Sequence, residues 1–348
     1  HTVATYDSVI LHITSDADID VHRTNGEPIP QLILTCPDYV YRNYHELVET
    51  ESYPPCYRII PTLSMFTIHS WMSALQLERF EQKASQLSER LKRCNSNWED
   101  AFFITLARNF GFGLNGDAFE TWANRIPLRA VDKHRDELFQ IEAFFFGQAG
   151  LLQGTAGDEY YLRLKKEYEY LSHKFGLTPM DVSQWRFLRL RPTNFPHIRI
   201  AQLAVLYHRS YGLLSRIMEA ETVTKVHEIL KGGTSAYWVN HYTFEHPSPS
   251  RPKTLSNSSL DLLIINTVAT FLYSYGVHKG KEEYCARAGA FLEELKAEYN
   301  YITRMWEQCG IKAANASDSQ ALIQLKKEYC DKKKCLYCRI GYEYLKRN

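Results

Sequence analysis

The sequence lacks the short motifs that identify the common enzyme classes. It contains no Gly-x-Ser-x-Gly turn, no Walker phosphate loop, no His-Glu-x-x-His helix, and no dinucleotide-binding glycine fingerprint placed after a predicted strand. Each of these motifs holds a nucleophile, a phosphate or a metal at a fixed spacing. Without them, the sequence predicts no specific reaction.

The sequence also lacks an excess of charge of either sign. Lys and Arg number 41 and Asp and Glu number 40, which gives a formal net charge of +1. A balanced chain has no overall field that would attract nucleic acid or a membrane surface. The charges are nevertheless uneven, because residues 1–60 carry a net charge of −6 and residues 320–348 a net charge of +5. We interpret the basic tail as a solvated surface that also stabilises nearby thiolates.

Cysteine is too scarce for a disulfide scaffold, with eight residues in a chain of 348. No signal peptide opens the sequence, and no apolar run approaches the length of a membrane span. We therefore expect a protein of the reducing cytoplasm with no membrane partner. The sequence begins at His1 and a strand-like run follows almost at once, so we also expect upstream residues that complete a sheet. Five scattered cysteines are Cys36, Cys56, Cys94, Cys285 and Cys309.

A hydrophobic fraction of 45% and an aromatic fraction of 13% predict a substantial buried core. Residues 9–14 have strand-like composition and residues 19–23 continue in an extended style. Asn25-Gly26 is typical of a hairpin turn, and residues 31–35 are predicted to be the returning strand. From about Tyr39 the apolar residues follow a helical period. We predict a mainly α-helical protein in three parts. They are a partial β-sheet portion (1–38), a multi-helix domain (39–316), and a final helix with a Cys-rich, metal-binding tail (317–348).

The helical period predicts an amphipathic helix from Ile68 to Cys94. Asn97 is placed to cap the next helix, whose first turn is acidic. Pro, Ser and Asn cluster in residues 247–258, which predicts a surface loop. Other helices are predicted over 116–124, 132–152, 157–174, 195–217, 221–230, 259–276, 281–298, 299–308 and 317–329.

An arginine- and aromatic-rich segment occupies residues 185–199. Asn194 stands where a helix N-cap belongs and Pro196 follows in the first turn, which leaves backbone amides free for an anion. The alternative, which we prefer, is that the arginines pair with buried acids such as Glu142 and that the aromatic rings belong to the core. The candidate phosphate ligands are Arg189, Arg191, Asn194 and Arg199, with Trp185, Phe187 and Phe195 as stacking faces for bases.

Glu142 is a single carboxylate in the apolar stretch 142–150. A buried carboxylate needs a partner, and we expect an arginine from residues 185–199. A catalytic role would require a second acid, and none is evident, so we favour a structural role. His241 and Asn240 could line the cleft of a small-molecule enzyme, although an isolated histidine is more often a hydrogen-bonded structural residue.

Three cysteines crowd the end of the chain, at Cys330, Cys335 and Cys338. A Cys-x2-Cys pair forms a tight knuckle whose sulfurs can face one metal ion, and a third thiolate completes most of a tetrahedral shell. We expect Cys309 as the fourth ligand because it is nearest in the sequence, with Cys285 and Cys56 as alternatives. We expect zinc in a structural role, and a [4Fe–4S] cluster is the alternative cofactor.

Several stretches together resemble one uncharacterised bacterial family, domain of unknown function 2851, which is widespread in Bacteroidetes. The resemblance implies no established activity. It does imply an upstream acidic, strand-rich segment that faintly resembles a metal-dependent nuclease core. The stretches are Tyr6–His12, Trp98–Asp100, Leu106–Gly111, Glu142–Gly150, Arg191–Ala204, Tyr237–Tyr242 and the tail from Asn315 to Gly341.

Two main hypotheses follow. The chain is a nucleic-acid-associated protein, related to nucleases, that holds backbone phosphate with Arg189, Arg191 and Arg199 and carries a structural metal site. Alternatively, it is a helical scaffold that binds a protein partner and has no catalytic activity. A small-molecule enzyme built around His241 has the least support.

Overall fold

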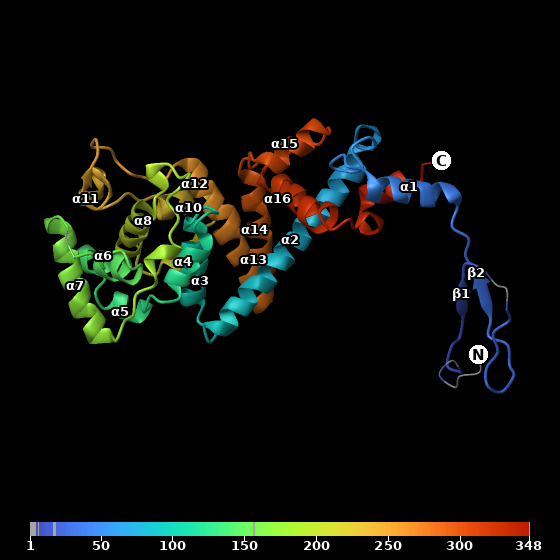
Figure 1. The fold of residues 1–348 in the computed structure, drawn as a ribbon, viewed down its shortest axis with the longest axis horizontal. Helices are drawn as coiled ribbons and strands as arrows, with labels where there is room; N and C mark the ends of the chain where they lie inside the picture. Colours follow the sequence, from blue (N-terminus) through green and yellow to red (C-terminus); the bar gives the residue numbers. More distant parts are fainter. Residues whose placement is uncertain (1–4, 6, 17–18, 156, 348) are drawn as a thin grey trace. The chain divides into compact units, whose positions relative to one another are not determined.

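The computed structural model describes residues 5, 7–16, 19–155 and 157–347, so Tyr6 of the family-like stretch lies outside the described residues. The fold is mainly helical, as predicted, with only short strands (Figure 1). The chain forms two compact units. Unit 1 comprises residues 1–75, 300–312 and 322–348, and unit 2 comprises residues 76–299 and 313–321.

Two short strands lie side by side in unit 1, β1 (His12–Thr14) and β2 (Gln31–Ile33) (Figure 1). They pair in parallel, with His12 opposite Gln31. The hairpin turn predicted at Asn25-Gly26 is confirmed, because His22 forms an antiparallel bridge with Pro28 across it and Arg23 donates to the Glu27 carbonyl at 2.8 Å. The returning strand itself pairs in parallel with β1, which the sequence did not predict.

The helices of unit 1 join the two ends of the chain. Asn43 of α1 (Asp38–Glu49) donates hydrogen bonds to the carbonyl oxygens of Tyr344, Leu345 and Arg347. Figure 1 shows the C-terminus beside this helix. The other helices are η2 (Ile60–Thr62), the start of α2 (Met65–Arg93), α15 (Tyr301–Gln308), the π-helical η6 (Leu325–Cys330), η7 (Cys335–Tyr337) and α17 (Arg339–Leu345).

Unit 2 is almost entirely helical. Its largest pairings are α13 with α14 and α3 with α4 (Figure 1). The elements are the rest of α2, α3 (Trp98–Phe110), α4 (Gly116–Ala123), α5 (Leu128–Asp132), α6 (Leu138–Gln148), α7 (Glu159–Phe175), η3 (Val182–Gln184), η4 (Pro192–Asn194), α8 (Pro196–Arg209), α9 (Leu213–Glu219), α10 (Val223–Leu230), α11 (Ala236–Val239), β3 (His241–Thr243), β4 (His246–Pro247), α12 (Asn257–Leu263), η5 (Ile264–Val268), α13 (Ala269–Lys279), α14 (Glu282–Glu294) and the first part of α16 (Ala316–Gln324).

The centre of unit 2 is built on α6, which is apolar on every face. Ile141 through Gln148 are all buried, and Phe144, Phe145 and Phe146 are completely covered. A helix that is hydrophobic all round belongs in the interior, because no face of it gains from water. Trp122 of α4 packs edge-on against Phe145 and donates its indole N–H to the Phe145 carbonyl at 2.9 Å.

Several predicted helices have different bounds. The helix expected over 195–217 is broken into α8 and α9 at Gly212, which has a left-handed φ of 60°. The helix expected from residue 132 begins at Leu138, because residues 133–137 form turns. The loop over 247–258 is mostly exposed, yet Lys253 and Leu255 are buried.

The expectation that no apolar run approaches a membrane span is wrong. The helical stretch Asn257–Lys279 is long and apolar enough by length and composition, and 67% of its most apolar window is buried inside unit 2. A buried helix of this kind is typical of a core as well.

Candidate functional site

Four cysteines line one small cavity in unit 1. Its walls include Cys56, Cys330, Cys335 and Cys338, and its volume is about 10 Å³. The three tail cysteines therefore lie at one cavity. All eight cysteines are free thiols. Burial in apolar surroundings raises the pKa of Cys56 to about 12 and raises the pKa of Cys330 as well.

The fourth cysteine of this cavity is Cys56 and not the expected Cys309. Cys56 is buried and lies in the loop between α1 and η2, whereas Cys309 caps the C-terminus of α15 and does not line the cavity. No local spacing links Cys56 to the tail, so the sequence could not rank it above Cys285. Among the described residues, no group of three or more His, Cys, Asp or Glu side chains stands in an arrangement that could hold a metal ion.

The cysteine knuckle is tightly folded. The backbone amide of Cys338 donates to the Cys335 carbonyl at 3.2 Å, and the Cys338 carbonyl accepts from the amide of Tyr342 at 2.8 Å. A Cβ on Gly341 would lie 2.2 Å from the Cys335 carbonyl oxygen, so only glycine fits there. Burial raises the pKa of the Cys338 thiol, and the backbone amides of Gly341 and Ile340 only partly oppose this effect.

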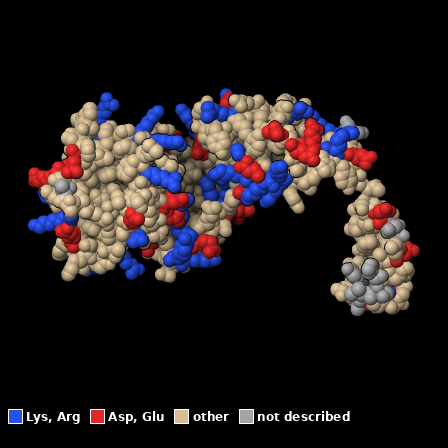
Figure 2. All heavy atoms as spheres, viewed as in Figure 1, with Lys and Arg blue, Asp and Glu red and all other residues tan. Residues whose placement is uncertain are grey.

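Basic and aromatic side chains surround the knuckle. Lys332, Lys333 and Lys334 are exposed, and Tyr337 and Leu336 between the cysteines are 77% and 56% exposed. Lys332 pairs with Glu328 and Lys333 donates to the Val48 carbonyl, whereas no partner is found for Lys334 among the described residues. Elsewhere, basic and acidic side chains intermix on the visible face of the molecule (Figure 2).

The arginines of residues 185–199 do not converge on one surface. Arg199 is buried, and its guanidinium donates to Gln202 at 2.9 Å and to Asn194 at 2.7 Å. Arg189 and Arg191 are exposed. Among the described residues, these arginines do not pair with Glu142 as expected: Arg199 donates to neutral amides, and Glu142 accepts from hydroxyl groups. Burial without a carboxylate lowers the pKa of Arg199 to about 10.

The aromatic rings of this segment divide between core and surface of unit 2. Trp185 is buried and donates its indole N–H to the Ala149 carbonyl at 2.8 Å. Phe187 and Phe195 are half-buried and contact each other edge-on, with ring centroids 5.4 Å apart. The helix that follows, α8, has no side-chain cap. Neither ring is presented as an open stacking face.

Arg199 is covered by Phe112, whose ring centroid lies 4.4 Å from the guanidinium carbon. Phe112 belongs to the segment Gly111–Gly116, which has the glycine spacing of a dinucleotide-binding turn. This segment joins α3 to α4 and follows a helix rather than a strand. It therefore lacks the strand-to-helix context on which nucleotide binding depends.

Glu142 is held by hydroxyl groups instead of an arginine. Ser235 donates to it at 2.8 Å, and the hydroxyl of Tyr160 donates to its other oxygen. Burial raises the pKa of Glu142 to about 7, and the hydrogen bonds only partly oppose this effect. The cluster is closely packed, since Tyr160 stacks on Tyr237 with ring centroids 4.0 Å apart. A structural role for Glu142 fits this surrounding.

His241 completes the same stack. Its ring lies parallel to the Tyr237 ring, with centroids 4.0 Å apart, and its Nδ1 lies 2.9 Å from the Tyr237 carbonyl. The hydroxyl of Tyr237 donates to Asp158 at 2.5 Å. The two tyrosine hydroxyls and the Nδ1 of His241 therefore each have a polar partner.

The largest cavity described in unit 2 has a volume of about 570 Å³ and lies beside the N-terminus of α3. It is lined by Glu99, Asp100 and Asp132 together with several basic side chains. Burial and the Asp132 charge raise the pKa of Glu99. Asp132 is already held by Arg135 at 3.2 Å and by the Tyr207 hydroxyl at 2.8 Å. The cavity is therefore a cleft whose acids are balanced by neighbouring bases.

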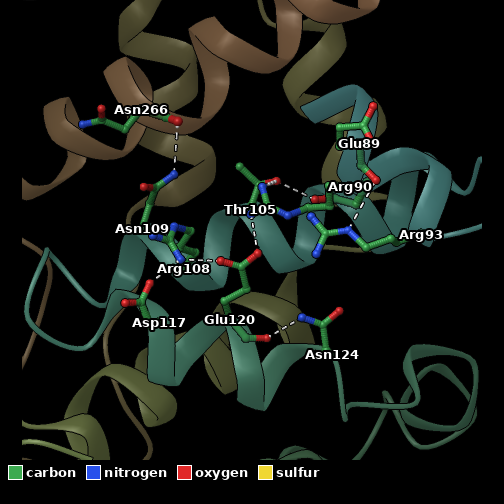
Figure 3. A network of polar contacts seen from close by, with 11 residues as sticks. Glu89, Arg90, Arg93, Thr105, Arg108, Asn109, Asp117, Glu120, Asn124 and Asn266 are labelled. Carbon is green, nitrogen blue, oxygen red and sulfur yellow. Dashed lines mark hydrogen bonds and ion pairs between the residues drawn. The ribbon is translucent and has the colours of Figure 1, made fainter. Parts of the chain in front are cut away.

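A polar network joins α2, α3 and α4 nearby (Figure 3). Arg90 donates to Glu120 at 2.6 Å and to Thr105 at 2.9 Å, and Arg108 bridges Glu120 and Asp117. Burial would raise the pKa of Glu120, but the two arginines outweigh it and hold the pKa below its usual value. This network explains why charged residues persist between packed helices.

Residues 1–301 match a family described as "Protein of unknown function (DUF2851)". The chain belongs to the DUF2851 family. No curated protein and no solved structure gives a significant match. The DUF2851 match confirms the resemblance found in the sequence. It includes Cys56 and ends before Cys330, so the tail cysteines lie beyond the matched residues.

Proposed function

We propose that this DUF2851 protein binds single-stranded nucleic acid through its C-terminal basic segment, residues 327–342. The observation that carries the proposal is the exposure of Tyr337, at 77%, inside a run of basic residues. A tyrosine gains little from facing water alone, but its ring offers a stacking face to any base.

Charge supports the same segment. Residues 320–348 hold eight basic and three acidic side chains, whereas the whole chain is nearly neutral. Lys334 is exposed and has no partner among the described residues, so its ammonium group is available to a phosphate. Arginine and lysine near exposed aromatic rings are typical of proteins that bind single strands without strict sequence preference.

The buried position of Arg199 changes the earlier hypothesis about residues 185–199. Its guanidinium is engaged with amide oxygens and covered by a ring, so phosphate contact would have to come from Arg189 and Arg191 alone. The proposal therefore rests on the tail. The proposal concerns binding and includes no cleavage step.

The test is the affinity of the full chain for a fluorescent single-stranded oligonucleotide at low salt. Tyr337→Ala removes one stacking face worth about 1–3 kcal/mol, so the Kd should rise roughly 5- to 150-fold. Tyr170→Ala, which removes a tyrosine that is 57% exposed in unit 2, is the matched control and should leave the Kd unchanged. Lys334→Ala should make the salt dependence shallower by roughly 0.7 in the slope of log K against log salt.

Undetectable binding by the unaltered protein at low salt would refute the proposal. Equal losses from the Tyr337 and Tyr170 substitutions would refute the assignment to the tail. The scaffold hypothesis would then be preferred, since exposed tyrosine and leucine side chains also suit a protein partner.

A further inference from the structure

We propose that Cys56, Cys330, Cys335 and Cys338 form a four-thiolate site for one zinc ion. The site would fasten the loop between α1 and η2 to the C-terminal tail of unit 1. It does not depend on nucleic-acid binding, and its test uses the metal alone.

The first argument is the convergence of three chain segments on one cavity. Cys56 comes from the loop near the start of the chain, Cys330 from the end of the π-helical turn η6, and Cys335 and Cys338 from the knuckle. Four of the eight cysteines in the chain line this one cavity. Cysteine sulfurs from separate segments gather in this way when one ion is shared between them.

The second argument is a buried donor that has no acceptor. The indole Nε1 of Trp71 is buried and has no hydrogen-bond partner among the described residues, and it lies beside the Cys338 sulfur. The amides of Ile340 and Gly341 act on the same sulfur. Donors directed at a ligand sulfur offset its negative charge and orient it, which is the usual arrangement around metal-bound cysteines.

The third argument is the π-helical geometry that precedes Cys330. The amide of Asp331 donates to the Lys326 carbonyl at 2.8 Å, and the amide of Lys334 donates to the Tyr329 carbonyl at 2.8 Å. Both bonds span five residues. Such wide turns are rare in proteins overall, and those that occur are often found at functional sites. Here the wide turn directly precedes the first tail cysteine.

Size and charge favour zinc over an iron–sulfur cluster. A cavity of about 10 Å³ is close to the space of one water molecule, which suits a single ion and leaves no room for four irons and four sulfides. Zinc with four thiolates carries a net negative charge, and exposed Lys332, Lys333 and Lys334 lie next to the knuckle to balance it. A four-thiolate shell has no open position, so the role is structural.

The thiols of the described residues do not stand at ligand positions in this structure. Zinc binding must therefore draw the sulfurs together. Because thiols bind zinc as thiolates, binding would release protons. The shared ion would also stabilise the folded tail against the loop that contains Cys56. We expect the tail to become more protected when zinc is present.

The experiment is elemental analysis of the full chain, purified with reductant and reconstituted with zinc. We expect about one zinc per chain. Cys56→Ser should lose most of this zinc, whereas Cys309→Ser, the matched control, should retain it. The proposal would be overturned if the Cys56 variant kept all of its zinc. It would also be overturned if the unaltered protein contained iron instead of zinc, or no zinc at all.

A second measurement applies if Cys56→Ser fails to fold. The unaltered protein is treated with an alkylating reagent with and without a chelator, and modified cysteines are identified by mass spectrometry. Zinc should protect Cys56, Cys330, Cys335 and Cys338 together and leave Cys309 unaffected. Equal alkylation of the four with and without chelator, or disulfides among them in freshly purified protein, would overturn the site.

Discussion

The substitution Glu142→Gln should change how the stability of unit 2 depends on pH. Burial raises the pKa of Glu142 to about 7 from its ordinary value of 4.5, because the ionised form is poorly solvated at this position. The folded state therefore holds a proton that the unfolded chain releases over this interval. Linkage requires the free energy of unfolding to fall as the pH rises from about 4.5 to about 7.

The size of the effect follows from the difference between the two pKa values. At about 1.4 kcal/mol for each pH unit, Glu142 lowers the free energy of unfolding by about 3 kcal/mol across the interval. Glutamine keeps the shape and one oxygen acceptor for Ser235 and the Tyr160 hydroxyl, but it does not titrate. The variant should therefore gain about 3 kcal/mol relative to the unaltered protein between pH 4.5 and pH 7.

Urea denaturation at a series of pH values measures this difference. Tryptophan fluorescence is weighted toward unit 2, since four of the six tryptophans (Trp98, Trp122, Trp185 and Trp238) lie there. Glu169→Gln on α7 is the control, because Glu169 is exposed, and its curve should stay parallel to that of the unaltered protein. Parallel curves for the Glu142 variant as well would refute the account of Glu142 as a buried, protonated carboxyl group.

Three further substitutions test the packing of the described residues by urea denaturation. Glu120→Gln should lower the free energy of unfolding by about 2 kcal/mol at neutral pH. Because the pKa of Glu120 is lowered in the folded state, this loss should shrink as the pH falls through that pKa, and a loss independent of pH would contradict the ion-pair account. Asn97→Ala removes the cap of α3, whose side chain accepts from the amides of the first turn, and should cost about 1 kcal/mol; an unchanged midpoint would contradict the cap. Gly147→Ala would place a Cβ 2.0 Å from the ring of Tyr168 and should cost about 1–3 kcal/mol, whereas a neutral result would show that the α6–α7 contact is looser than described.

Local patterns predicted much of unit 2. Asn97 caps α3 as expected, because a cap depends only on residues within one turn. The helices near 68–94, 116–124 and 157–174 were predicted within a few residues, since their apolar periods are strong. The break at Gly212 was missed because the apolar period continues across it, and only the left-handed backbone conformation interrupts the helix.

Partner choice over long distances was harder to predict. Glu142 accepts hydrogen bonds from the hydroxyl groups of Tyr160 and Ser235, and no spacing rule connects these residues to it. Arg199 donates to Asn194 and Gln202, which are three to five residues away in the sequence. Local spacing could therefore have predicted these amide partners. The parallel pairing of β1 and β2 was also out of reach, because a turn signal fixes only the residues beside it.

The division of the chain has a consequence for its synthesis. Unit 1 needs residues from both ends of the chain, whereas unit 2 is supplied almost wholly by one continuous stretch. On a ribosome, unit 2 can fold before residues 322–348 have been synthesised, but the early segment that contains α1 must wait for them. A truncation that removes residues 322–348 would thus disrupt the segment around α1 as well.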